Sequence, residues 1–369
     1  MKFIVREPIS INELSSLIQI PAILIKDSNR HIQLVNGKFE SNMELNIPLV
    51  AGDIDLNKVE SVLLFEKGNI PHVKMEHEMK CYDSTKLLNE IEVFEQLFPF
   101  IKKEIIGFSV LGTPIIELKI GDGPKKIHMN GSFHANEWIT TSIMMYWLST
   151  YLQGLVTNSS EDGHDLMSLY SETTLSFVPM VNPDGVDLVL NGLPENRAVQ
   201  EEVLKINQHQ QDFSQWKANI RGVDLNNQYP ANWEIEKERK IPKKPAPRDY
   251  PGDYPLSEPE SIALADLVKK GSFDRVLAFH TQGEEIYWGY LGKEPDEAGF
   301  IVSEFERLSS YKAIRNIDSH AGFRDWFVNE YQKPGYTIEL GYGVNPLPFE
   351  DSYSIYQKCN RLFLAALYL

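Results

Sequence analysis

From residue 82 onward, short apolar segments of strand length alternate with longer segments whose apolar residues recur at helical spacing. The expected strands cover 103–111, 115–120, 126–130, 174–180, 275–280 and 336–340. The expected helices cover 87–97, 139–152, 257–270 and 296–307. This alternation predicts an α/β fold with a mostly parallel sheet and helices on both faces. Ligands of such sheets bind beyond the carboxyl ends of the strands, so we expect the functional residues where these strands end.

The charge and hydropathy of the chain exclude several classes of partner. Its 369 residues include 36 basic and 52 acidic side chains, which gives a net charge of −16. Attraction to nucleic acid or to an anionic membrane needs clustered Lys and Arg, so we expect neither partner. No apolar segment approaches the roughly 18 residues of a membrane helix. The first ten residues lack the apolar stretch of a secretory signal, which predicts a cytoplasmic protein, with unusual export or spore association left open.

The segments between the predicted elements carry few signals of their own. Cys81 and Cys359 are the only cysteines, which excludes a disulfide framework and a cysteine-based zinc cluster. Six prolines between residues 242 and 259 predict an ordered surface loop. The connector 51–79 contains one expected strand and a polar cluster made of His72, Glu76, His77 and Glu78. The two histidines are five residues apart beside a proline, which suits no regular face, so we interpret the cluster as a solvated charge run.

Residues 1–50 are expected to form a small α+β module. The predicted order is a strand at 3–5, a helix capped by Ser10, a second short helical turn at 23–25 and a strand at 44–48. This order resembles a LysM peptidoglycan-binding module, on the strength of the segments INELSSL, KDSN and ELNIP. The usual Gly-Asp-Thr-Leu entry is absent, since EPIS stands there. The resemblance implies glycan binding, and the alternative is a packing module that binds nothing.

A histidine and a glutamate follow the expected strand 126–130, just before a helix. His134 and Glu137 are three residues apart, so in a turn they can aim a nitrogen and a carboxylate oxygen at one point. They would supply two of the three protein ligands of a His₂Glu catalytic zinc site, which keeps its fourth position for water. A lone His-x-x-Glu pattern is common by chance. The third ligand should be a histidine at the end of another strand, and His280 stands there, after the strand 275–280.

Six segments in one order give this chain its resemblance to a known family. They are GSFHANEW, VPMVNPDGV, RGVDLNNQYP, SEPES, LAFHTQG and YTIEL. Over residues 80–369 the chain resembles the zinc carboxypeptidases of the carboxypeptidase A type. Within that group it is most similar to the bacterial γ-D-glutamyl–diamino acid endopeptidases, which cut cell-wall peptides and several of which carry LysM modules. The resemblance implies a carboxypeptidase-like fold and one zinc ion held by His134, Glu137 and His280.

The same resemblance assigns two catalytic residues. Glu339, in the segment YTIEL, becomes the general base and acid that carries a proton from the attacking water to the leaving amine. A buried structural salt bridge is the alternative role for this glutamate. Attack on an amide also develops an oxyanion, which needs a preset positive donor. Arg221 matches the family's arginine in that role, and Lys217, which directly follows a tryptophan, is the competing assignment.

Two positions depart from the digestive exopeptidases of this family. Those enzymes hold the terminal carboxylate of the substrate with an Asn-Arg pair, and the matching residues here are Asn226 and Asn227. Amides cannot replace a charged bidentate grip at equal strength, which argues against strict exopeptidase action. The family's mobile active-site tyrosine corresponds to Ile317, and Tyr311 or His320 are the candidates to replace it.

A third departure concerns substrate specificity. The residue just before the Asp-Trp step lines the family's specificity pocket, and here it is Arg324. Members that select apolar side chains have an apolar residue there, so an arginine predicts recognition of a carboxylate. The alternative is that Arg324 pairs with an acidic neighbour such as Asp325 or Glu330.

We therefore predict a zinc metallopeptidase that hydrolyses the amide between γ-D-glutamate and the diamino acid of peptidoglycan stem peptides or muropeptides. Arg324 would hold one of the free carboxylates that flank this bond. A second hypothesis is that the protein is a metallocarboxypeptidase that removes acidic C-terminal residues from ordinary peptides. A third hypothesis is that the protein is not an enzyme but binds the cell wall. The intact set of metal ligands and the presence of Glu339 disfavour this hypothesis. The expected partners are the stem peptide and, through the N-terminal module, glycan.

Overall fold

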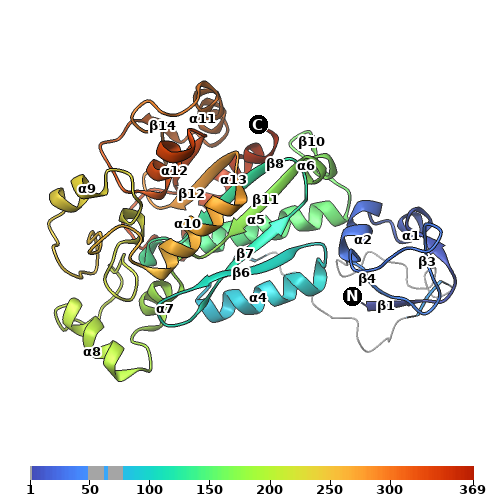
Figure 1. The fold of residues 1–369 in the computed structure, drawn as a ribbon, viewed down its shortest axis with the longest axis horizontal. Coiled ribbons are helices and arrows are strands. Elements are labelled where there is room, and N and C mark those ends of the chain that lie inside the picture. The colour runs from blue at the N-terminus through green and yellow to red at the C-terminus, as the bar shows by residue number, and fades with distance from the viewer. Residues whose placement is uncertain (1, 49–61, 65–77) are drawn as a thin grey trace.

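The structure is a computed structural model that describes residues 2–48, 62–64 and 78–369 (Figure 1). It consists of a large α/β body over residues 78–369 and a small N-terminal module. The predicted polar cluster of the connector lies outside the described residues except for the exposed Glu78, so its interpretation as a charge run stays a prediction.

An eight-stranded mixed sheet forms the centre of the large body. In spatial order its strands are β14 (Lys312–Arg315), β13 (Glu285–Trp288), β15 (Gly335–Glu339), β12 (Arg275–His280), β8 (Lys125–Gly131), β11 (Thr173–Val178), β7 (Pro114–Ile120) and β6 (Lys102–Phe108). The four central strands β15, β12, β8 and β11 are parallel to one another, and β14 is parallel to β13. Antiparallel pairing joins β13 to β15, β7 to β11 and β6 to β7. The predicted mixed, mostly parallel sheet is confirmed.

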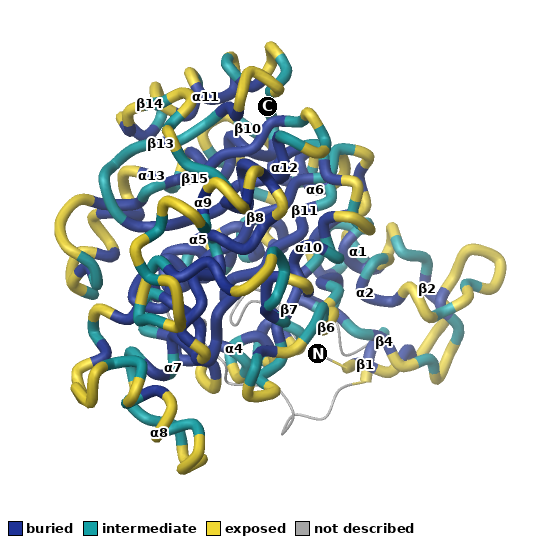
Figure 2. Tube along the Cα trace, turned by 60° about the vertical axis from the view of Figure 1, so that its left-hand side comes forward, coloured by how far each residue is buried: buried dark blue, intermediate teal, exposed yellow. Residues whose placement is uncertain are grey.

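Helices cover both faces of this sheet, as predicted. Leu277 and Phe279 of β12 belong to the apolar cluster of α4 (Ser84–Leu97), α5 (Ile139–Val156), α11 (Asp296–Ser309) and α13 (Ser352–Tyr368). Val276 and Ala278 of the same strand belong to the cluster of α10 (Pro259–Gly271) and α12 (Phe323–Tyr331). Successive side chains of a strand point to opposite faces, so the two helix groups sandwich the sheet. Figure 2 shows the resulting buried layer along β8, β11 and α5.

The connections between these elements contain shorter segments. They are the strand pair β9 (Ser160–Glu161) and β10 (His164–Asp165), with α6 (Leu166–Glu172), α7 (Pro183–Asn191), α8 (Arg197–Ile206) and α9 (Trp233–Arg239). The start of α7 follows from its sequence, because Asn182 accepts from the backbone N–H of Gly185 at 3.1 Å and Pro183 fits the first helical position. Residues 242–256 contain no helix or strand, as predicted, and the helix expected over 257–270 begins at Pro259. Within the described ranges, every helix is too short or too polar to cross a membrane.

The N-terminal module has the predicted strand–helix–helix–strand order. Its elements are β1 (Lys2–Val5), β2 (Ile9–Ser10), α1 (Ile11–Ile18), α2 (Ala22–Ser28), β3 (Lys38–Phe39) and β4 (Glu44–Asn46), with β5 (Leu63–Leu64) from the connector. Strand β1 lies between β4 and β5 and is antiparallel to both. Ser10 and Glu13 form a reciprocal capping box at the start of α1. Whether the module is a LysM relative and binds glycan stays a prediction.

The module packs on the amino edge of the central strands. Arg30 donates to Asp122, just before β8, at 2.8 Å, and the Tyr170 hydroxyl donates to Asp27 at 2.7 Å. Apolar residues of both parts form one continuous core cluster. Figure 1 shows α2 and β4 beside the sheet body. The module is therefore at the opposite end of β8 from the residues that follow this strand.

Candidate active site

The His-x-x-Glu pattern lies in a tight turn at the carboxyl end of β8. Ser132 follows the strand with a φ of 49°, and its N–H donates to Oγ1 of Thr140 at 2.9 Å. The Thr140 hydroxyl in turn donates to the carbonyl of Glu137 at 2.9 Å. These bonds fold the turn back over the start of α5. The single-turn helix Ala135–Glu137 then carries Glu137 beside His134.

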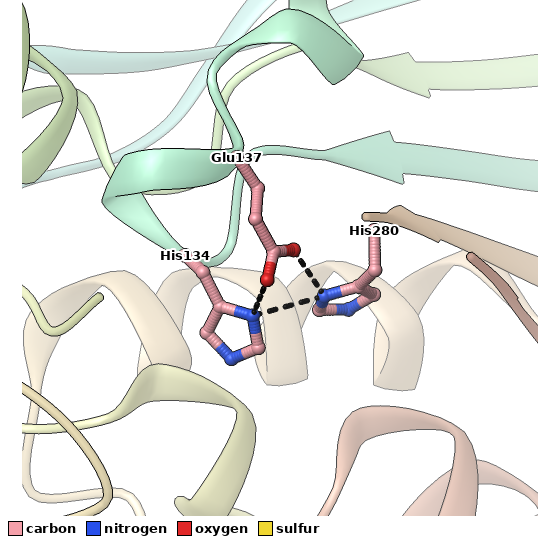
Figure 3. A group of neighbouring side chains, drawn as sticks. All are labelled: His134, Glu137 and His280. Carbon is pink, nitrogen blue, oxygen red and sulfur yellow. Dashed lines mark hydrogen bonds and ion pairs between the residues drawn. The ribbon is translucent and has the colours of Figure 1, made fainter. Parts of the chain in front are cut away.

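The structure brings His134, Glu137 and His280 together, as Figure 3 shows. Nδ1 of His134 lies 2.9 Å from Oε1 of Glu137, and Nδ1 of His280 lies 3.0 Å from Oε2. The two Nδ1 atoms are 3.1 Å apart. β8 and β12 are parallel neighbours, with Gly131 opposite Phe279, so residues that follow or end these strands meet at one edge. All three side chains are buried.

This donor set fits a zinc ion. Two imidazole nitrogens and a carboxylate, all within 4.8 Å of one another, are the ligand types of catalytic zinc sites. Nε2 of His134 lies 3.1 Å from Oδ1 of Asp224, which leaves Nδ1 free to face the site. Although burial opposes its charge, His134 and His280 hold the pKa of Glu137 far below the ordinary value. The carboxylate form that a metal requires is thus the favoured one.

A second layer of contacts fixes the orientation of Glu137. The backbone N–H of Thr281 donates to Oε2 at 3.2 Å, and the Asn345 amide donates to Oε1 at 3.4 Å. Thr281 and Asn345 are themselves joined, since the threonine hydroxyl donates to the asparagine Oδ1 at 2.7 Å. The loop after β15 therefore supports a glutamate that lies on the turn after β8.

A cavity of about 350 Å³ opens over this cluster. Its wall includes His134, Asn136, Glu137, Gln215, Lys217, Arg248, Thr281, Gln282, Glu339, Gly343, Val344 and Asn345. Glu339 ends β15 directly opposite His280 on the parallel strand β12. Burial and then the charge of Glu137 raise the pKa of Glu339 to about 8. The cavity thus holds a metal-ligand set and a carboxyl group able to exchange protons near neutral pH.

Lys217, and not Arg221, lies on the cavity wall. The Lys217 ammonium is 3.4 Å from Asp224, and its side chain is only 19% exposed. Arg221 has a side chain that is 53% exposed, and its guanidinium lies 3.5 Å from Glu258. The structure therefore favours Lys217, the competing assignment, over Arg221 as the positive group beside the cluster.

Asn226, Asn227 and Arg324 also lie outside the wall of this cavity. Asn226 accepts from the backbone N–H of Phe323 at 3.0 Å, so its side chain anchors the start of α12. Asn227 is buried in the short turn that follows Asp224. Arg324 is 3% exposed and pairs with Asp325, but its Nη1 has no hydrogen-bond partner among the residues that the structure describes. This nitrogen is enclosed by the protein, so a carboxylate reaches it only after neighbouring side chains move.

The candidates for the missing tyrosine do not reach the cavity wall. Tyr311 is fully buried, and its oxygen accepts from the backbone N–H of Gly341 at 3.2 Å. Nδ1 of His320 lies 2.8 Å from the hydroxyl of Tyr290. The structure thus gives both residues packing roles.

Several residues of the site were not predicted from the sequence, among them Asp224, Arg248 and Asn345. Asp224, which holds His134, lies in the quoted segment RGVDLNNQYP, so that motif was its available signal. Arg248 lies in the proline-rich loop and Asn345 in the loop after β15, and no pattern in the sequence distinguishes either one. Only the tertiary fold brings these two loops to the cavity.

Comparison with known proteins identifies the family. Residues 87–327 match the zinc carboxypeptidase family profile. An uncharacterized protein, YqgT, from Bacillus subtilis (strain 168) is 53% identical over 78% of this chain and 78% of its own length. Gamma-D-glutamyl-L-diamino acid endopeptidase 1 from Lysinibacillus sphaericus is 50% identical over 78% of this chain and 72% of its own.

Solved structures confirm the predicted fold. Bovine thrombin-activatable fibrinolysis inhibitor, in complex with tick carboxypeptidase inhibitor, aligns with a TM-score of 0.61 at 18% identity, over 78% of this chain and 96% of that one. Carboxypeptidase A from Helicoverpa armigera aligns with a TM-score of 0.60 at 18% identity, over 81% of this chain and 75% of that one. The family match also confirms the predicted zinc cofactor and the metallopeptidase class. This chain belongs to the zinc carboxypeptidase family.

Proposed function

We propose that this protein hydrolyses the amide bond between γ-D-glutamate and the diamino acid of peptidoglycan stem peptides. The observation that carries the proposal is the 50% identity to the named γ-D-glutamyl-L-diamino acid endopeptidase, which extends over 78% of this chain. The cavity chemistry agrees with it, because a ligand set, a proton-exchanging carboxyl group and cationic side chains share one wall.

His134, Glu137 and His280 are the proposed zinc ligands. When bound there, zinc would supply a Lewis acid that activates water and polarises the scissile carbonyl. Glu339 is the proposed general base, which accepts a proton from the attacking water and then donates it to the leaving amine nitrogen. Its position at the end of β15, opposite His280, supports this role.

Lys217 is the proposed donor to the developing oxyanion. Burial alone would discharge a lysine, but Asp224 and Glu137 keep its pKa above the ordinary value. A charged ammonium on the cavity wall, preset by Asp224, stabilises negative charge without rearrangement during the reaction. We propose Lys217 for this function in place of Arg221.

Arg324 is the proposed group for a substrate carboxylate. Its unpartnered Nη1 supports the role. Asp325 partly neutralises the arginine. This pairing would lower the free-energy cost of burying the guanidinium charge while no substrate is bound. The diamino acid carries a free carboxylate next to the scissile amide, and this group is the proposed ligand. Asn226 and Asn227 are proposed as substrate-binding residues on the strength of the family resemblance alone.

The test is incubation of zinc-loaded protein with L-Ala-γ-D-Glu-meso-diaminopimelate, followed by mass spectrometry. We expect release of diaminopimelate that a chelator abolishes and added zinc restores. An α-linked L-Ala-L-Glu-diaminopimelate peptide serves as the comparison. If only the α-linked peptide is hydrolysed, the hypothesis of a carboxypeptidase that removes acidic C-terminal residues replaces the proposal. If the zinc-loaded protein hydrolyses neither peptide, the hypothesis of a non-catalytic cell-wall-binding protein is favoured.

The expected affinity of the N-terminal module for glycan stays a prediction. Its strand–helix–helix–strand order supports the LysM resemblance. The test is co-sedimentation of the full-length Glu339→Gln variant with insoluble peptidoglycan. This variant is not expected to digest the peptidoglycan.

A further inference from the structure

The active-site cavity contains more positive charge than the proposed mechanism uses. Arg248 lies on the cavity wall with Lys217, although the chain as a whole carries a net charge of −16. Lys217 is engaged by Asp224 at 3.4 Å. The carboxylates on the wall are Glu137, which belongs to the proposed ligand set, and Glu339. Arg248 is therefore a charged residue of the cavity to which the proposed mechanism gives no role.

Arg248 has only a weak local partner. Its Nε donates to Asp249 at 3.2 Å, and within residues 2–48, 62–64 and 78–369 its two terminal nitrogens have no hydrogen-bond or ion-pair partner. Asp249 also lies 3.9 Å from Lys217 and 3.6 Å from Lys240. One carboxylate thus faces three cations, so it cannot neutralise the guanidinium. The planar end of Arg248 stays available to a ligand.

The backbone around Arg248 is held firmly against the segment that supports His134. The carbonyl of Pro247 accepts from the N–H groups of Lys217 and Ala218 at 2.8 and 3.0 Å. The carbonyl of Tyr250 accepts from the N–H of Asp224 at 2.7 Å. Hydrogen bonds on both sides of Arg248 therefore fix its Cα relative to the metal-ligand cluster.

Arg324 and Arg248 differ in exposure, so each can contact a different part of the substrate. Arg324 is a buried residue of α12, whereas the side chain of Arg248 is 53% exposed at the open cavity. In a stem tripeptide the amine side of the scissile bond is a single diamino acid, which fits a closed site. The acyl side continues into further residues and has to leave toward solvent. Arg248 therefore lies where the acyl side would pass.

We propose that Arg248 binds the free carboxylate of the D-glutamyl residue on the acyl side of the scissile bond. This inference rests on the proposed function and adds a specificity-determining residue to it. A guanidinium and a carboxylate form two parallel charge-assisted hydrogen bonds, which an amide in the same place cannot match. The enzyme should therefore prefer stem peptides with a free glutamyl carboxylate over those in which this group is amidated to D-isoglutamine.

Steady-state kinetics on two substrates tests this inference. One substrate is L-Ala-γ-D-Glu-meso-diaminopimelate, and the other differs only in having the glutamyl α-carboxylate as an amide. The wild type should prefer the acid in kcat/KM by roughly tenfold or more, the usual effect of one charge-assisted pair. Arg248→Gln should bring this ratio close to one, mainly through a higher KM for the acid. Arg248→Lys should keep part of the preference.

The amide substrate also serves as the internal control for folding. Its kcat/KM should be the same in wild type and Arg248→Gln, and Lys244→Gln, an exposed change in the same loop, should leave both substrates unaffected. An unchanged acid-to-amide ratio in Arg248→Gln would overturn the inference, and so would an equal loss on both substrates. If zinc-loaded wild type cleaves neither peptide, the proposed function itself fails and the inference falls with it.

Discussion

Glu339 is the residue whose role separates catalysis from metal binding. It shares the cavity with Glu137, yet it takes no part in the close cluster of His134, Glu137 and His280. Its substitution should therefore affect proton transfer without removing a ligand.

We predict that Glu339→Gln retains zinc but loses turnover by about 10² to 10⁴-fold, the usual contribution of a positioned acid–base group. An amide has nearly the same shape but cannot accept the proton of the attacking water. The measurement is kcat on the γ-linked tripeptide together with zinc content by mass spectrometry. Near wild-type turnover in a zinc-loaded variant would refute the assigned role.

A second pair of substitutions distinguishes the two candidate oxyanion donors. Lys217→Gln should lower kcat by about 10² to 10³-fold, because the cavity loses the ammonium group that Asp224 holds in place. Arg221→Gln should change kcat far less, since Arg221 lies at the surface beside Glu258. The opposite ranking of the two variants would restore Arg221 to the role.

The limits of prediction at this scale have a physical cause. His134, Glu137 and His280 could be predicted because each follows or ends a buried parallel strand, and such strand ends converge. Lys217 and Arg221 are only four residues apart in a segment without helix or strand, so no periodicity tells which one faces the cavity. Arg248 and Asn345 depend on how two loops fold over the sheet.

At the scale of elements, the sequence predicted the strands β6, β7, β8, β11, β12 and β15 and the helices α4, α5, α10 and α11, but neither the edge strands β13 and β14 nor the helices α12 and α13. Strand β12 is buried along its whole length and was predicted with its exact ends. Strands β13 and β14 have four residues each and are largely half-buried or exposed, so they lack a continuous apolar signal. Helix α12 was not predicted, although it carries Arg324.

The start of α10 contains a carboxyl group that should make stability depend on pH. Burial raises the pKa of Glu260 to about 7, although the N–H of Val110 and the amide of Asn219 donate to it at 3.1 and 3.3 Å. Between the unfolded value near 4.5 and this value, the folded state holds a proton that the unfolded state has lost. This contribution to stability is complete below about pH 4.5 and is lost as the pH rises through 7.

We therefore predict that Glu260→Gln gains stability relative to wild type by about 2 to 3 kcal/mol between pH 5 and pH 8. The neutral amide avoids burying a charge at high pH. Urea denaturation of both proteins at the two pH values gives this difference directly. Glu201→Gln, on an exposed part of α8, is the matched control and should show no such trend; a flat difference for Glu260→Gln would refute the argument.

At the scale of the whole molecule, the N-terminal module and the catalytic cavity lie at opposite ends of β8. The two parts nevertheless share one apolar core cluster, so they should unfold together. Tyr170→Phe removes the hydroxyl that donates to Asp27 across the interface. We predict a loss of about 1 kcal/mol in the free energy of unfolding, a single transition, and unchanged kcat and KM. Two separate transitions in thermal unfolding would show that the parts fold independently.

Metal binding should also register in the stability of the whole chain. The proposed ligands come from β12 and from the turn after β8, and β8 and β12 are central strands of the sheet, so an ion that binds only the folded state stabilises the entire body. At a free zinc concentration of 100 times Kd, the gain is about 2.7 kcal/mol. We predict that a chelator lowers the melting temperature and that zinc restores it. His280→Ala should lose this zinc-dependent shift, whereas Glu339→Gln should keep it, since Glu339 is proposed to move protons and not to hold the metal.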